Sequence, residues 1–229
     1  MLLEKIKPLL DIYAQILLVS DKLFLKVHEE FPEQVLCKRG CSDCCNALFD
    51  LALIEALYIN YCFNKNFDSQ AQASILERAN KADRAVYRLK KNSYKDIQKG
   101  RSEKEILQQM AKERVRCPLL DEQNECVMYE SRPLTCRLYG VPTAIGGSSH
   151  ICGLSGFEEG KSYPTIKMDQ LQNEIQRLSL EATLSLNSKY PKLADMLVPL
   201  SMALLTSYDD EYLGIVKTTN AENNEDQKK

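Results

Sequence analysis

The sequence has no long hydrophobic run that could anchor the protein in a membrane. Asp50 and Glu55 interrupt even the apolar segment 47–61, so no stretch reaches the roughly 18 apolar residues that a membrane-spanning helix needs. Charged residues also break up the apolar N-terminus, MLLEKIKPLL, and we therefore expect no secretory signal peptide. These two absences predict a cytoplasmic protein that does not bind a membrane.

The sequence also has almost no excess of charge. Its 30 lysine and arginine residues nearly balance 32 aspartate and glutamate residues, which leaves a formal charge of −2. A balance of this kind gives no general attraction for phosphate backbones, so we expect no nucleic-acid partner. With 44% hydrophobic and 27% charged residues, the composition is that of a globular protein.

Cysteine, in contrast, is abundant and confined to the middle of the chain. All nine cysteines lie between Cys37 and Cys152, and the flanking segments have none. Clustered cysteines in a reducing compartment are more often metal ligands or redox groups than disulfides, and an odd number could not pair completely within one chain. The two histidines, His28 and His150, are too few for a histidine-rich zinc site, so sulfur must dominate any metal site.

Apolar residues recur at helical spacing along much of the chain, and the β-branched alternation typical of strands is scarce. The pattern predicts helices over 2–31, 47–63, 71–89, 102–115, 168–182 and 191–205. Ser102 followed by Glu105 resembles a capping box at the start of the fourth of these helices.

The segment 116–164 has no sustained apolar period, although it holds four of the nine cysteines and six of the nine glycines. An irregular stretch of that length needs something other than secondary structure to fix it, and a metal could do so. We therefore predict a mainly α fold: a single helical metal-binding domain over 1–218 with irregular cysteine-rich loops over 37–152. A polar, flexible tail is expected over 219–229.

Eight of the cysteines form two groups of candidate metal ligands. The first group is a compact C-x3-C-x2-C-C arrangement, made of Cys37, Cys41, Cys44 and Cys45. The second group is more spread and consists of Cys117, Cys126, Cys136 and Cys152. Structural zinc and cubane iron–sulfur clusters both commonly take four thiolates, so eight cysteines could form two sites or one site with spare sulfurs. Cys62 lies apart from both groups, and we expect it to be an ordinary core residue.

These residues resemble the CxxCxxCC family, which is described as a zinc- or iron-chelating domain and includes the cysteine-rich region of flagellin lysine N-methylases. The more specific part of the resemblance is a Cys-Pro pair at 117–118 followed by C-x-x-Y-x-x-R-P-x-x-C-R, which runs from Cys126 to Arg137. The first group departs from the family spacing, because three residues rather than two separate Cys37 from Cys41.

The resemblance implies a buried tetrathiolate site with a net negative charge, which requires cations or hydrogen-bond donors nearby. Arg132 and Arg137 are the expected donors, either to sulfur or to the carbonyls of the loop that carries the ligands. Tyr129 is expected to pack over the site.

Three functions stay open on these residues, and the sequence alone does not say whether the protein is an enzyme. The preferred one is an iron–sulfur protein, with a 4Fe-4S cluster that transfers electrons or supports another enzyme, since sulfur is so abundant. The alternative is a structural zinc module that displays a surface for a partner protein. The third is methylation of protein lysine through S-adenosylmethionine, which the flagellin relatives suggest, although the chain lacks the βα repeats of radical enzymes that use this cofactor. We expect the partner to be a protein, either a redox partner or a substrate.

Overall fold

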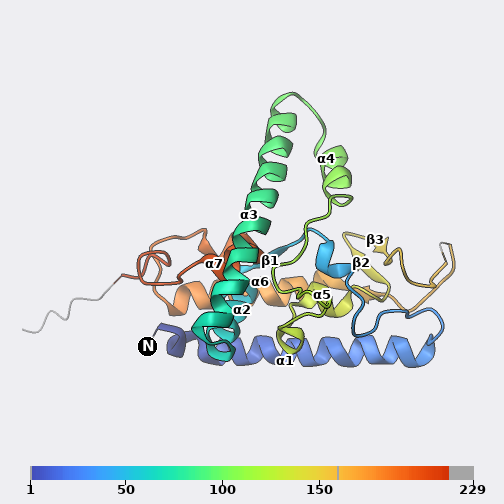
Figure 1. The fold of residues 1–229 in the computed structure, drawn as a ribbon, viewed down its shortest axis with the longest axis horizontal. Helices are drawn as coiled ribbons and strands as arrows, with labels where there is room; N and C mark the ends of the chain where they lie inside the picture. Colours follow the sequence, from blue (N-terminus) through green and yellow to red (C-terminus); the bar gives the residue numbers. More distant parts are fainter. Residues whose placement is uncertain (1, 159, 217–229) are drawn as a thin grey trace, which may run out of the picture.

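Seven α-helices and five short strands make up the regular structure of residues 2–158 and 160–216, the part of the chain that this computed structural model describes (Figure 1). The helices are α1 (Leu2–Glu30), α2 (Leu53–Asn66), α3 (Ser69–Gln98), α4 (Glu103–Met110), α5 (Leu134–Leu138), α6 (Met168–Ser185) and α7 (Leu200–Leu205). The predicted mainly α fold is therefore confirmed. The tail predicted over 219–229 lies outside the described residues.

The long helix α1 forms one side of the core, and α6 runs above it (Figure 1). The buried residues of α1 recur every three or four positions, which places them on the face that packs against α2, α5 and α6. They are Ile6, Leu10, Tyr13 and Leu17. None of the helices in the two described ranges is long and apolar enough to cross a membrane.

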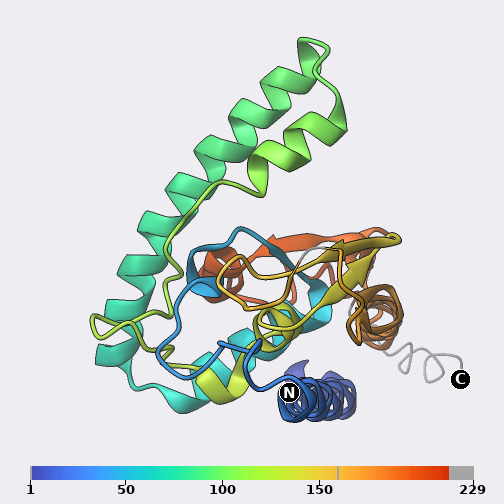
Figure 2. The same ribbon diagram turned by 90° about the vertical axis from the view of Figure 1, so that its right-hand side faces the viewer.

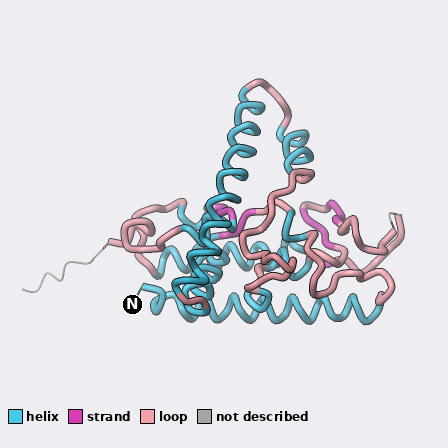
Figure 3. Tube along the Cα trace, viewed as in Figure 1, coloured by secondary structure: helices cyan, strands magenta, loops and turns pink. Residues whose placement is uncertain are grey.

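Two small sheets join segments that lie far apart in the sequence (Figure 3). In the first sheet, β1 (Asp50–Ala52) pairs antiparallel with β5 (Leu197–Pro199). In the second, β2 (Thr143–Ile145) lies between β3 (Ser148–His150), which is antiparallel to it, and β4 (Ile166–Lys167), which is parallel to it. The predicted irregular segment 116–164 thus contains a hairpin and the short helix α5.

The pairing of β1 with β5 shortens two of the predicted helices. The helix expected over 47–63 begins only at Leu53, because the backbone of 50–52 is extended and bonded to β5. The prediction of a helix over 191–205 is wrong for the first half of that segment, which forms a 3-10 turn and then β5. Helix α7 begins only at Leu200. Pro199 explains this boundary, since proline has no N–H for a helix interior but fits just before a helix.

Helices α3 and α4 form a hairpin that projects from the rest of the molecule (Figures 1 and 2). Both helices were predicted, but α3 is longer than the expected 71–89, and α4 ends at Met110 rather than at 115. The capping box is confirmed: the Ser102 hydroxyl accepts from the Glu105 N–H at 3.3 Å, and the Glu105 carboxylate accepts from the Ser102 N–H at 3.3 Å. The base of α3 packs against α7.

Candidate metal centre

Backbone pairing brings the two cysteine groups together. The N–H of Cys117 donates to the carbonyl of Cys45 at 2.6 Å, and the N–H of Val115 donates to the carbonyl of Asn46 at 3.0 Å. An antiparallel bridge between Ala47 and Arg114 continues this pairing. The chain therefore leaves the site, forms the α3–α4 hairpin and returns to place Cys117 beside the Cys44–Cys45 pair.

A tight turn after Cys117 brings Cys126 back to the same place. Leu120 and Cys126 form an antiparallel bridge, and the N–H of Val127 donates to the carbonyl of Leu119 at 2.9 Å. The carboxylate of Asp121 fixes the turn by accepting from two backbone N–H groups inside it. Sequence spacing alone would allow Cys126 to lie elsewhere, so this local turn is what adds it to the site.

The fourth cysteine segment, α5, is held in place by the buried carboxylate of Glu55. Its Oε1 atom accepts from the N–H of Leu134, the first residue of α5, at 3.3 Å and from the hydroxyl of Tyr13 at 2.8 Å. Its Oε2 atom accepts from the N–H of Ala52 at 3.2 Å. One carboxylate thus links α1, the start of α2 and the helix that carries Cys136.

Arg137, also on α5, fixes the loop between Cys126 and Cys136. Its buried guanidinium pairs with the carboxylate of Asp21 on α1 and donates to the backbone carbonyl of Glu130. It also donates through Nε to the carbonyl of Arg132 at 2.9 Å. Its donors therefore reach carbonyls of the cysteine-bearing loop, one of the two kinds of acceptor expected from the sequence.

Arg132 and Tyr129, both in the loop between Cys126 and Cys136, lie against each other. The expected packing of Tyr129 over the site stays a prediction. The guanidinium carbon of Arg132 is 3.5 Å from the centre of the Tyr129 ring, and that of Arg39 is 5.5 Å from it. Arg132 lines the same cavity as five of the cysteines, and its positive charge adds to the hydrogen bonds from Cys136 and Cys45 in lowering the pKa of the Cys44 thiol. Its role as a donor to a metal centre stays a prediction.

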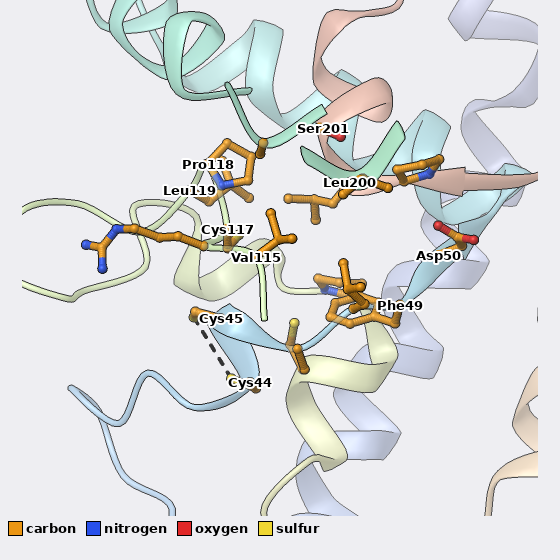
Figure 4. Close-up of a pocket in the computed structure, with 18 of the residues that line it drawn as sticks. Cys44, Cys45, Phe49, Asp50, Val115, Cys117, Pro118, Leu119, Leu200 and Ser201 are labelled. Atoms are coloured by element: carbon orange, nitrogen blue, oxygen red, sulfur yellow. Dashed lines mark hydrogen bonds between the residues drawn. The ribbon is translucent and has the colours of Figure 1, made fainter. Parts of the chain in front are cut away.

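A cavity of about 400 Å³ is the centre of this arrangement. Five cysteines line it: Cys44, Cys45, Cys117, Cys126 and Cys136. Figure 4 shows Cys44 and Cys45 on one side of it and Leu200 and Ser201 on the other. Much of the remaining wall is apolar and comes from segment 47–49, the facing sides of α3 and α4, and α7.

The thiols of the cavity influence one another. The Sγ atoms of Cys44 and Cys45 are 4.0 Å apart. Hydrogen bonds from Cys136 and Cys45 lower the pKa of the Cys44 thiol, and the same bonds, together with burial, raise the pKa values of those two donors. Burial raises the pKa of Cys117 to about 12. Metal ligation by these buried thiols must therefore release protons.

The other three candidate ligands lie outside the wall of this cavity. Burial raises the pKa of Cys37 to about 11, and the neighbouring thiols of Cys41, Cys44 and Cys152 add to the effect. Cys152 Sγ lies 3.8 Å from Oδ2 of Asp43, a residue that the sequence analysis did not select. The side chain of Cys37 packs directly against the backbone of Gly140. A Cβ atom at position 140 would be only 2.9 Å from the sulfur of Cys37, so only glycine leaves room for this contact.

The structure therefore divides the eight candidate cysteines into five around the cavity and three beside it. The ninth, Cys62, is buried within α2. All nine are free thiols. Across residues 2–158 and 160–216, no group of three or more His, Cys, Asp or Glu side chains is placed to hold a metal ion. The five sulfurs border one space, and as soft donors they suit zinc or iron.

Glu55 gives the site a pH-dependent support that can be measured. Burial raises the pKa of its carboxyl, so the folded state favours the protonated form. Its contribution to stability is complete below the pKa of the unfolded chain, about 4.3, and is lost as the pH rises through the higher pKa of the folded state. Because Glu55→Gln stays neutral, its free energy of unfolding is expected to rise relative to that of the natural chain when the pH increases from 5 to 8. Urea unfolding at both pH values measures this gain, and an unchanged difference would contradict it.

Comparison with known proteins identifies a family for the part of the chain that carries the candidate cysteines. A family model named CxxCxxCC, with the description "Putative zinc- or iron-chelating domain", matches residues 36–153, just over half of the chain. The match includes all five cysteines of the cavity, the three beside it and the α3–α4 hairpin. No curated protein and no solved structure matches the chain.

Proposed function

The chain belongs to the CxxCxxCC family of zinc- or iron-chelating domains, and from this premise we propose that the five cysteines of the cavity bind a 4Fe-4S cluster. Four thiolates suffice for such a cluster, so one of the five is a spare or substituting ligand. The three remaining cysteines form a second candidate group with Asp43. In this proposal the protein is an electron-transfer protein or supports another enzyme.

The observation that supports the proposal is the cavity itself. Five thiols line one space of about 400 Å³. A cluster of several metal and sulfide atoms can span separated thiols, whereas one tetrahedral ion needs its four ligands within about 2.3 Å of a single point.

The residues around the cavity suit a buried, negatively charged group. The guanidinium of Arg132 offsets part of the negative charge of the thiolates. Arg137 and Glu55 hold the segment that carries Cys136. The apolar side chains of the wall limit the access of water, which influences the reduction potential of any cluster there. A bound cluster would supply one-electron chemistry.

Zinc is the alternative, and one distance favours it. The 4.0 Å between the Sγ atoms of Cys44 and Cys45 is close to the spacing of about 3.8 Å between two thiolates on one tetrahedral zinc ion, since zinc–sulfur bonds measure about 2.3 Å. A zinc ion would make the protein a structural module whose metal fixes the cysteine-rich loops.

Metal and acid-labile sulfide analysis of protein purified without oxygen distinguishes the two. We expect about four iron and four sulfide per cluster, with a broad visible absorption that disappears on reduction. Zinc at one or two per chain without sulfide would overturn the iron–sulfur proposal and support the structural module. Addition of S-adenosylmethionine to the reduced protein tests the methylation alternative, which requires a change in the spin signal of the cluster.

A further inference from the structure

The near-neutral charge of the chain hides a strong separation of charge. Residues 77–116, which include most of α3 and all of α4, contain 13 lysine and arginine residues but only six aspartate and glutamate residues. This segment therefore carries a net charge of +7, and the rest of the chain carries −9. Because the segment forms the projecting hairpin, its positive charge is presented away from the acidic remainder of the molecule (Figure 2).

Part of this charge forms a stripe along the outer face of α3. Its six members follow one another at intervals of one or three residues and lie opposite the buried residues Ala79, Ala82 and Val86. The stripe consists of Arg84, Tyr87, Arg88, Lys91, Tyr94 and Lys95. All six are exposed, and each of the two tyrosines keeps 62% of its surface accessible.

The four cations of the stripe have no carboxylate partner within 4.0 Å among the described residues. Other cations of the hairpin do have carboxylate partners: Lys81 pairs with Glu77, Lys90 with Asp50 and Arg101 with Asp96. Within the stripe, Lys91 Nζ lies 5.6 Å from the centre of the Tyr87 ring. The stripe thus combines uncompensated positive charge with exposed aromatic surface.

We propose that this stripe docks an acidic patch of a partner protein. Tyrosine and arginine are enriched among the residues that dominate binding energy in protein interfaces, and complementary charge speeds and orients association. A long nucleic acid would extend beyond the hairpin toward a remainder of net charge −9, where it would be repelled, whereas a compact acidic patch avoids this repulsion. The proposal does not depend on which metal the cysteines bind.

The test uses the full metal-loaded chain and a fluorescein-labelled twelve-residue peptide of glutamate, aspartate and two phenylalanines. Fluorescence anisotropy at low salt is expected to detect binding, which Arg88→Glu with Lys91→Glu weakens by roughly tenfold. The matched control is Lys22→Glu with Lys26→Glu, which makes the same change of charge at exposed positions of α1. We expect the control pair to weaken binding by no more than about twofold.

Further measurements separate the contribution of aromatic surface from that of charge and test the class of partner. Tyr94→Ala is expected to weaken peptide binding without changing its dependence on salt, since it removes aromatic surface and no charge. Metal content and circular dichroism must be unchanged in all these variants, which separates loss of docking from loss of the metal centre. Equal weakening by both charge-reversed pairs would overturn the assignment to α3. Tighter binding of a twelve-nucleotide thymidine oligomer than of the peptide would overturn the protein partner in favour of a nucleic acid.

Discussion

Replacing Cys44 by alanine is expected to remove most of the bound metal and to loosen the cysteine-rich part of the fold. Cys44 interacts with the thiols of both Cys45 and Cys136 and therefore connects the two cysteine groups. Metal binding by thiolates contributes about 10 kcal/mol or more to the folding of small metal domains, so the loss of one ligand has a large effect. Metal analysis per chain and limited proteolysis of the segment 114–136 measure the outcome.

Two further variants show whether this effect belongs to the site. Cys136→Ala should behave like Cys44→Ala, because it removes a thiol from the same cavity. Cys62→Ala should leave the metal content alone, since Cys62 is buried within α2 and does not line the cavity. Unchanged metal stoichiometry in both Cys44→Ala and Cys136→Ala would contradict the assignment of the cavity as the metal centre.

Arg137→Met is expected to cost about 3 kcal/mol of stability. The change keeps the aliphatic stem but removes a buried cation from the carboxylate of Asp21 and from the carbonyls of Glu130 and Arg132. The Asp21 side chain retains 37% exposure, so water compensates part of the loss, and the expected cost is at the lower end for a broken buried pair. In a chain of this size the melting temperature should fall by roughly 6–12 °C.

Loss of metal should accompany this destabilisation, because Arg137 holds the loop between Cys126 and Cys136. Retention of metal against a chelator measures this effect. Arg84→Met is the matched control: it makes the same chemical change at an exposed position of α3 and should alter stability by less than about 0.5 kcal/mol. Equal melting temperatures for the two variants would show that the contacts of Arg137 contribute nothing.

The helices with a clear apolar period could be predicted from the sequence, and the strands could not. In helix α1 and the centre of α3, apolar residues recur with a period of about 3.6 residues. This pattern can be recognised within the segment itself, without knowledge of the rest of the chain. Strands β1 and β5 are three residues each, and their extended conformation depends on pairing with a partner that lies far away in the sequence. Sequence patterns carry no information about such a partner, which explains why two predicted helices begin too early.

The candidate site shows the same division between local and distant information. The cysteine groups and the role of Arg132 as a nearby cation come from local spacing and from a family resemblance. The division into five and three cysteines depends on the pairing of Cys117 with Cys45, which no local pattern encodes. Glu55 had a signal, since it is a charged residue within an apolar segment, but its contacts with Tyr13 and Leu134 appear only in three dimensions.

The position of the α3–α4 hairpin in the chain determines the order in which the metal centre can be assembled. Cys45 leaves the ribosome 91 residues before Cys136, with the whole hairpin between them. At ordinary rates of synthesis this interval lasts roughly 5–20 s, and the first cysteines gain Cys117 and Cys126 as partners only toward its end. Metal that arrives early can be held only by Cys37 to Cys45, whereas the complete centre can close only after α5 has been made. Metal that is to be held by the complete centre must therefore arrive after α5 has been made, either late in translation or after it.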